Sequence, residues 1–324
     1  MKISKLLITF LTFCFLCLNA NELVQGKPIK KKIVYLVSDI NIPFWNIMAK
    51  GIEKGTDLLG YDFEILDAQN SAKKELENTI KAIKDEVSGI IVSPTNSSAC
   101  VTILKLAKEA NIPVVISDIG TDGGEYVSYI SSNNKNGAYK IGKLLTNKMI
   151  EKGFSNKKVG IIAISQKRLN GQERTIGFIK ALDESNIVNA NLKQLVTWTQ
   201  EETYNYTKEM LTNYPDLNAI WIQTSSIYKG ALKAINESQR KDEILLVTFD
   251  AEPEFLNLIP KEIIIASGMQ QPYLMGKTAL IQLDSHLNGI NVKKNLQLPI
   301  LIISAKNIEK KLPIIKLNVL GIEK

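Results

Sequence analysis

Short apolar runs alternate with amphipathic stretches along the chain from Lys32 onward. Unbroken apolar runs predict strands that are buried on both faces of a sheet, and apolar positions at helical spacing predict helices. Strands that alternate with helices indicate parallel sheets built by right-handed crossovers, which is an α/β fold. The first expected elements are strand Ile33–Val37, helix Phe44–Leu59, strand Phe63–Leu66, helix Lys73–Glu86, strand Gly89–Val92, helix Ala99–Ala110 and strand Pro113–Ser117.

Three of these features return in the second half of the chain, in the same order and at a nearly constant offset. The pairs are Lys31–Val34 with Lys157–Gly160, Gly89–Val92 with Ala219–Ile222, and Pro113–Asp118 with Glu243–Asp250. The repetition predicts two similar Rossmann-like lobes with parallel sheets. The alternative is a single large doubly wound sheet.

The C-terminal part is expected to cross between these lobes more than once. It holds strand Ile263–Ala266, helix Leu274–Leu287 and strand Leu298–Ile303. We therefore expect a first lobe of residues 31–132 plus 270–297 and a second lobe of residues 133–269 plus 298–324. Several crossings would form a hinge rather than a loose linker.

Residues 1–20 have the pattern of a secretory signal peptide. Lys2 and Lys5 precede the apolar run Leu6–Leu18, and Ala20 offers a small residue for cleavage. The run is shorter than the roughly 20 apolar residues of a membrane-spanning helix. We expect cleavage after Ala20 and a periplasmic location.

The cysteines are compatible with this location. Cys14 and Cys17 lie in the leader, where Phe13 and Leu16 precede them instead of the small residue that lipid attachment requires. Cys100 then remains alone, so no intramolecular disulfide is expected and the fold depends on its apolar cores.

No motif for catalysis, metal binding, cofactor binding or nucleic-acid binding is found in the sequence. Phosphate-binding loops, dinucleotide fingerprints, zinc-protease motifs and nucleophile elbows are missing. His286 is the one histidine, near the end of a predicted helix, where it complements the helix dipole. The net charge of +7 falls to +5 without Lys2 and Lys5, and basic and acidic residues are interspersed. We therefore expect a binding protein rather than an enzyme or a nucleic-acid-binding protein.

Polar and aromatic residues instead follow the carboxyl ends of the predicted strands, the edge where open α/β sheets bind ligands. The pair Phe44-Trp45 is expected to be exposed for stacking on an apolar ring face. Trp198 follows a predicted strand Gln194–Val196, and Arg174 is expected to begin the helix after strand Ile161–Ser165. The candidate ligand-binding residues are Asn41, Phe44, Trp45, Asp118, Arg174, Trp198, Thr224, Asp250 and Gln270.

With these residues in order, the sequence resembles the type I periplasmic binding proteins, specifically the ribose-binding group. The resemblance covers about Lys32 to Ile303. Its marks include Asn41–Trp45, Gly60-Tyr61, Leu66–Asn70, Gly89–Thr95, Ala110–Val115, Gln172–Phe178, Thr248–Asp250 and Gln270–Pro272.

The resemblance implies roles for the candidate residues. Asn41, Phe44 and Trp45 would form the first-lobe wall, Asp118 would accept paired ring hydroxyls, and Arg174, Trp198, Asp250 and Gln270 would be second-lobe and hinge contacts. Two positions depart from the pentose binders, because Ile119 replaces an arginine and Thr224 replaces an asparagine. A buried site discriminates on whether each hydroxyl finds a partner, so ribose itself is in doubt. The ligand could be less hydroxylated than ribose, or not a sugar.

The resemblance also implies partners. The leading expectation is a monomeric receptor that closes around a small polar ligand, a sugar or a sugar-like molecule, and delivers it to the membrane permease of an ABC importer. The alternative is a ligand-sensing partner of a membrane histidine kinase or chemoreceptor. The same fold serves lactose-repressor-type transcription factors, but those carry an N-terminal helix-turn-helix, whereas the first strand here begins at Ile33 behind a leader.

Overall fold

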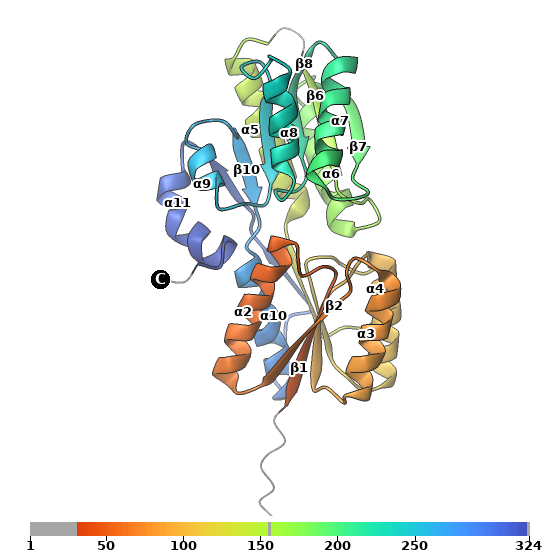
Figure 1. Ribbon diagram of the computed structural model, residues 1–324. Coiled ribbons are helices and arrows are strands. Elements are labelled where there is room, and N and C mark those ends of the chain that lie inside the picture. Colours follow the sequence, from red (N-terminus) through yellow and green to blue (C-terminus); the bar gives the residue numbers. More distant parts are fainter. Residues whose placement is uncertain (1–30, 155–156, 323–324) are drawn as a thin grey trace, which may run out of the picture. The chain divides into compact units, whose positions relative to one another are not determined.

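The computed structural model describes residues 31–154 and 157–322 (Figure 1). The predicted signal peptide, with Cys14 and Cys17, lies outside the described residues. No helix in the described part of the chain is long and apolar enough to cross a membrane.

The first sheet has six strands in the spatial order β11-β5-β4-β3-β1-β2, and all its neighbours are parallel. In this register Tyr35, on the strand next to the edge strand β2, lies opposite Ile65 on one side and Ile91 on the other. The strands are β1 (Lys32–Val37), β2 (Asp62–Asp67), β3 (Gly89–Ser93), β4 (Val114–Ser117), β5 (Ser128–Ser132) and β11 (Asn295–Leu298).

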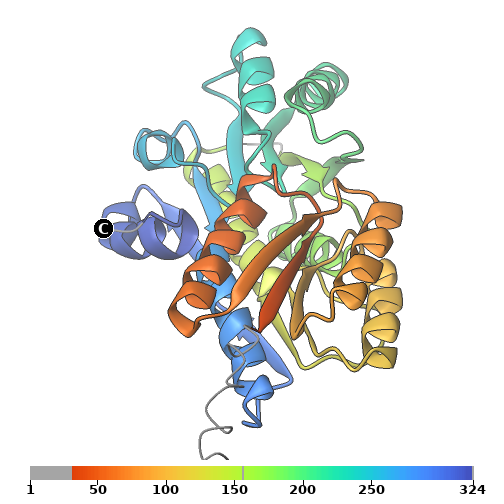
Figure 2. The same ribbon diagram turned by 60° about the horizontal axis from the view of Figure 1, so that its bottom comes forward.

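Helices cover both faces of this sheet, as its unbroken apolar strands require. Helices α2 (Pro43–Leu59) and α10 (Pro272–Leu287) pack on one face, and α3 (Ala72–Lys84) and α4 (Ser97–Glu109) on the other (Figure 2). Two glycines let α2 and α10 approach closely, because a Cβ at Gly51 would collide with the Tyr273 carbonyl and one at Gly276 with the Met48 carbonyl.

The second sheet has the order β12-β10-β9-β8-β6-β7. Helices α5 (Asn134–Glu151) and α6 (Leu169–Asp183) pack on one face, and α7 (Gln200–Asn213) and α8 (Tyr228–Glu237) on the other. The strands are β6 (Lys158–Ala163), β7 (Val188–Gln194), β8 (Leu217–Ile222), β9 (Leu245–Phe249), β10 (Ala266–Met269) and β12 (Leu301–Ser304). Three short helices complete the described part of the chain: α9 (Phe255–Leu258), α11 (Ile308–Ile314) and the π-helix η2 (Ile315–Val319).

The two sheets have the same strand order and differ in the direction of their last strand, because β11 is parallel to β5 and β12 is antiparallel to β10. The shared order confirms the predicted pair of Rossmann-like lobes. Each sequence repeat falls on equivalent strands: β1 with β6, β3 with β8, and β4 with β9. The exact division of residues between the lobes stays a prediction.

Three strand predictions are wrong in detail. The expected strand Leu298–Ile303 is two strands in different sheets, and β12 runs antiparallel to β10 because the chain enters it directly from β11 without a crossover helix. Strand β7 ends at Gln194, and Val196 is exposed beyond it. Strand β10 begins at Ala266, because Ile264 and Ile265 fill the core from a loop and Ile263 before them is exposed.

Candidate ligand-binding site

A small cavity lies where the carboxyl ends of strands from both sheets converge. Its volume is about 30 Å³, which leaves room for roughly two ordered water molecules. It is lined by Ile42, Phe44, Trp45, Asp118, Ile164, Arg168, Asn170, Arg174, Trp198, Thr224, Asp250 and Gln270. The structure therefore brings together every predicted ligand residue except Asn41.

The two aspartates occupy equivalent places in the two lobes. Asp118 follows β4 and Asp250 follows β9, and both adopt a left-handed backbone conformation, with φ of 67° and 65°. In each case the backbone N–H donates to the neighbouring strand, to Ile130 O and Gly268 O respectively. Aspartate tolerates this conformation better than most residues, and such strain clusters at ligand sites.

Asp118 is held by donors from three directions. Its Oδ2 accepts from Trp45 Nε1 at 3.2 Å, and its Oδ1 accepts from Asn170 Nδ2 at 3.2 Å and from Gln270 Nε2 at 3.4 Å. Burial raises the pKa of Asp118, although the guanidinium groups of Arg174 and Arg168 oppose the rise. The carboxylate thus links the first-lobe aromatic wall to the second lobe.

One carboxylate oxygen of Asp250 accepts no hydrogen bond. Its Oδ2 lies 3.6 Å from Arg174 Nη1, whereas its buried Oδ1 has no hydrogen-bond partner. Burial raises the pKa of Asp250 to about 7, against the field of Arg174 and with a further rise from Asp118. A buried acceptor without a partner is costly, so a ligand that supplies a donor here would be bound favourably.

Arg174 connects three segments that end at the cavity. It donates from Nε to Asn134 Oδ1 at 2.9 Å, from Nη1 to Gln223 O at 2.7 Å, and from Nη2 to Gln270 Oε1. Its guanidinium lies over the Phe249 ring, 4.1 Å from the centroid. Arg174 is in the second turn of α6, not at its start as predicted, because the helix already begins at Leu169.

Aromatic side chains from both lobes flank the cavity. Trp45 is 3% exposed, so the expected exposed pair is wrong for this residue, while Phe44 is half-buried and meets it edge to face. Trp198 has φ of 57°, unusual for a bulky residue. Glu202 supports this turn by accepting from the backbone N–H groups of Val196 and Trp198 at 2.8 and 2.9 Å.

Asn41 lies outside the cavity. It is exposed, and both its backbone N–H and its Nδ2 donate to Asp39 Oδ1. The next residue, Ile42, lines the cavity in its place. The contact expected from the first-lobe asparagine is therefore not supported by this structure.

Comparison with known proteins decides the family. The profile described as periplasmic binding protein domain matches residues 33–291, which is more than half of the chain. The chain belongs to the periplasmic binding proteins. Its relatives include the ribose import binding proteins RbsB of Escherichia coli, 30% identical over 82% of this chain and 87% of that protein, and of Bacillus subtilis, 29% identical over 82% and 84%. These matches confirm the resemblance to the type I, ribose-binding group.

Solved structures show the same fold. The solute-binding protein of Agrobacterium radiobacter in complex with D-arabinose aligns with a TM-score of 0.83 at 19% identity, over 90% of this chain and all of that chain. A periplasmic solute-binding protein of Actinobacillus succinogenes with bound D-allose aligns with a TM-score of 0.80 at 21% identity, over 87% and 100%. The family and these neighbours are binding proteins.

Sequence reasoning missed four lining residues of this binding protein: Ile42, Ile164, Arg168 and Asn170. Ile164, Arg168 and Asn170 come soon after β6, at the carboxyl edge of the sheet where Arg174 was also expected. The rule that open α/β sheets bind ligands at this edge could have predicted these three residues as well. It could not have shown that the Arg168 and Asn170 side chains reach across to the first lobe.

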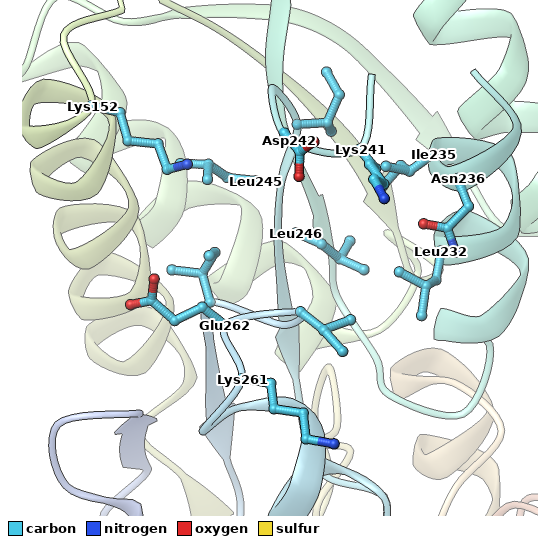
Figure 3. A pocket seen from close by; sticks show the side chains of 13 residues that line it. Lys152, Leu232, Ile235, Asn236, Lys241, Asp242, Leu245, Leu246, Lys261 and Glu262 are labelled. Carbon is cyan, nitrogen blue, oxygen red and sulfur yellow. The ribbon is translucent and has the colours of Figure 1, made fainter. Parts of the chain in front are cut away.

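A second hollow, of about 780 Å³, lies at the same edge and is lined by Ile40 and Asn41 after β1 and by Ala251 and Glu254 after β9. Another hollow of this binding protein lies away from that edge. A pocket of about 300 Å³ sits beside the start of β9, at Leu245 and Leu246, and carries the solvent-facing Lys152, Lys241 and Lys261 (Figure 3). It lies at the opposite end of the strand from Asp250. Among residues 31–154 and 157–322, no cluster of His, Cys, Asp and Glu could hold a metal ion. Cys100 is fully buried, and burial raises the pKa of its thiol to about 12, which suits a packing role.

Proposed function

We propose that this binding protein is exported to the periplasm and closes around a small, hydroxyl-rich, uncharged ligand, in keeping with a sugar, for delivery to an ABC importer. The observation that carries the proposal is the convergence of Asp118 and Asp250 with the indoles of Trp45 and Trp198 at one cavity. Carboxylates accept hydroxyl hydrogen bonds, and aromatic faces suit the apolar faces of sugar rings.

The unpaired atoms support a ligand rich in donors. Asp250 Oδ1 and Asn170 Oδ1 are both buried acceptors without a partner. The nearby guanidinium of Arg174, by contrast, already donates to three protein acceptors. An uncharged polyol therefore matches the free groups better than an anion does.

Closure of two lobes is the proposed mechanism. Residues of both lobes line the cavity, so their contacts to one ligand can form together only in the closed state. A ligand shifts the balance between open and closed states by its differential affinity for the closed one, and about 10⁴-fold preference converts a 1:99 closed population to 99:1. The protein would act as a monomer that presents the closed form to a membrane permease.

A thermal-shift screen over pentoses, hexoses, polyols and small metabolites tests the proposed ligand class. A ligand at 100 times its dissociation constant should add about 2.7 kcal/mol to the free energy of unfolding. If only anionic or amine-bearing metabolites stabilise the protein, the uncharged-polyol assignment is refuted.

A sensory role is the second candidate. Its specific support is Ile119, which is fully buried in the first-lobe core where the pentose binders place a cleft arginine. A departure at such a position is compatible with a ligand read by a histidine kinase or chemoreceptor instead of an importer. Neighbouring genes distinguish the two: a permease with an ATPase indicates import, and a histidine kinase indicates sensing.

A further inference from the structure

The side chain of Arg168 joins the second lobe to the first. Arg168 is the residue before α6, which packs on the second sheet, and is only 4% exposed. Its Nε donates to Thr95 O at 3.0 Å, and its Nη2 donates to Ser38 Oγ at 3.3 Å and to Asn70 Oδ1 at 3.1 Å. The three acceptors follow β3, β1 and β2 of the first sheet. One guanidinium therefore binds three loops of the opposite lobe.

The same guanidinium covers both indoles at the cavity. Its carbon lies 5.3 Å from the centroid of the Trp45 ring and 5.2 Å from that of the Trp198 ring, within the range of cation–π attraction. Beside it the cavity measures about 30 Å³, which leaves room for roughly two ordered water molecules. A ring can therefore stack on either indole only after the Arg168 side chain has moved away.

The two residues after Arg168 make the same crossing. The Leu169 N–H donates to Ser97 Oγ at 3.2 Å, and Asn170 Nδ2 donates to Asp118 Oδ1 at 3.2 Å. Ser97 is the first residue of α4 and Asp118 follows β4, so both acceptors belong to the first lobe. The donors and the acceptors are all groups of the protein, so these contacts form without a ligand.

The charge of Arg168 strengthens its contacts across the cleft. Burial lowers the pKa of Arg168 to about 10, a fall that the nearby carboxylate of Asp118 opposes, so the guanidinium is charged at neutral pH. A hydrogen bond from a charged donor is roughly twice as strong as a neutral one. One such bond, net of its competition with water, shifts an equilibrium by about tenfold or more. Because the donors and acceptors lie on opposite lobes, these bonds break when the lobes separate and favour the closed arrangement.

We propose that Arg168 is an autoinhibitory latch, which holds the two lobes closed in part of the ligand-free population and covers the indoles that a ligand needs. A ligand enters when the lobes open and the guanidinium leaves the indoles, and it then completes closure through its own contacts. The latch consists only of protein groups, so this inference goes beyond the proposed function and holds for any small ligand. Removal of the latch should lower the closed-to-open ratio of the ligand-free protein by about tenfold or more.

Solution scattering and acrylamide quenching of tryptophan fluorescence test the latch on protein refolded from urea and kept free of ligand. Arg168→Ala should have a larger radius of gyration than the wild type, and its fluorescence should be quenched more strongly because Trp45 and Trp198 become accessible. The fully buried Trp221 supplies a constant background. Arg168→Lys should lie between the two, because it keeps a cation and loses the forked donors. The control Lys167→Ala alters an exposed neighbour in the same loop and should match the wild type.

Urea unfolding shows whether each variant is folded, and Arg168→Lys supplies the comparison if Arg168→Ala does not fold. A folded Arg168 variant with the radius of gyration of the wild type would overturn the latch, and so would an equal increase in Lys167→Ala. Unchanged quenching in a more open Arg168 variant would show that the guanidinium does not cover the indoles, which overturns the autoinhibition. Because no ligand enters these measurements, each of these results leaves the proposed function standing.

Discussion

Glu75 offers a quantitative test of the structure of the first lobe, because its buried carboxyl group holds Thr95, a residue that contacts Arg168 of the cavity. It is 1% exposed on α3 and accepts from Thr95 N at 2.8 Å and from Thr95 Oγ1 at 2.9 Å. The Thr95 carbonyl in turn accepts from Arg168. Burial raises the pKa of Glu75 to about 7, although both Thr95 bonds and the Arg168 charge oppose the rise.

The raised pKa fixes the sign of the pH dependence. The folded protein holds the Glu75 proton more tightly than the unfolded chain, whose carboxyl titrates near 4.5. Its contribution to stability is therefore fully present below about pH 4.5 and is lost as the pH rises through 7. A rise from 4.5 to about 7 corresponds to about 3 kcal/mol, at about 1.36 kcal/mol for each pH unit.

Glu75→Gln removes the titration and preserves the shape. The amide oxygen can accept from the Thr95 N–H, and the Thr95 hydroxyl can accept from the amide nitrogen. The unfolding free energy of Glu75→Gln relative to the wild type should therefore grow by about 3 kcal/mol between pH 4.5 and pH 8, from the linkage relation. Urea unfolding at several pH values measures this difference, in which the other titrating groups cancel.

Glu77→Gln on the exposed side of the same helix is the matched control and should show no such growth. A Glu75→Gln difference that stays constant between pH 4.5 and pH 8 would refute the reasoning, since it would mean that Glu75 titrates alike in the folded and unfolded chains.

Three further predictions concern binding and export. Asp250→Ala should weaken ligand binding at least about 100-fold in calorimetry at pH 8, where a carboxyl with a pKa of about 7 is mostly ionised, because a charged acceptor contributes about 1.5–3 kcal/mol for each hydroxyl bond. Unchanged affinity would place this carboxylate outside the ligand contacts. Ligand should reduce the radius of gyration in solution scattering, and tight binding without compaction would refute lobe closure. Ligand should also change the tryptophan fluorescence. Trp198→Phe should reduce this fluorescence change yet retain binding, whereas the fully buried Trp221 should contribute little to it. Mass spectrometry of protein from the native cell should show a mature start near Asn21, and a chain that keeps its leader would contradict export.

Local pattern was sufficient for most of the architecture. The apolar run Ile33–Val37 and the amphipathic stretch that became α2 were predicted nearly to the residue, because burial on both faces of a sheet and on one face of a helix leaves distinct periodicities. The boundaries failed where apolar residues fill the core from a loop, as at Ile264 and Ile265, or where one apolar run supplies two sheets, as on either side of Pro299.

The sequence by itself determined the two-lobe α/β fold, the family and the strand ends that carry the candidate ligand residues. It did so because repeats, periodicity and the carboxyl-edge rule depend only on order along the chain. Only the tertiary structure decided that Asn41 turns toward Asp39 and that Arg168 reaches Thr95, Ser38 and Asn70. The Arg168 contacts join residues far apart in sequence and depend on side-chain direction where the two lobes meet, whereas Asn41 turns to a residue two positions away. No local pattern records that direction, since it is set by the packing of both lobes at once.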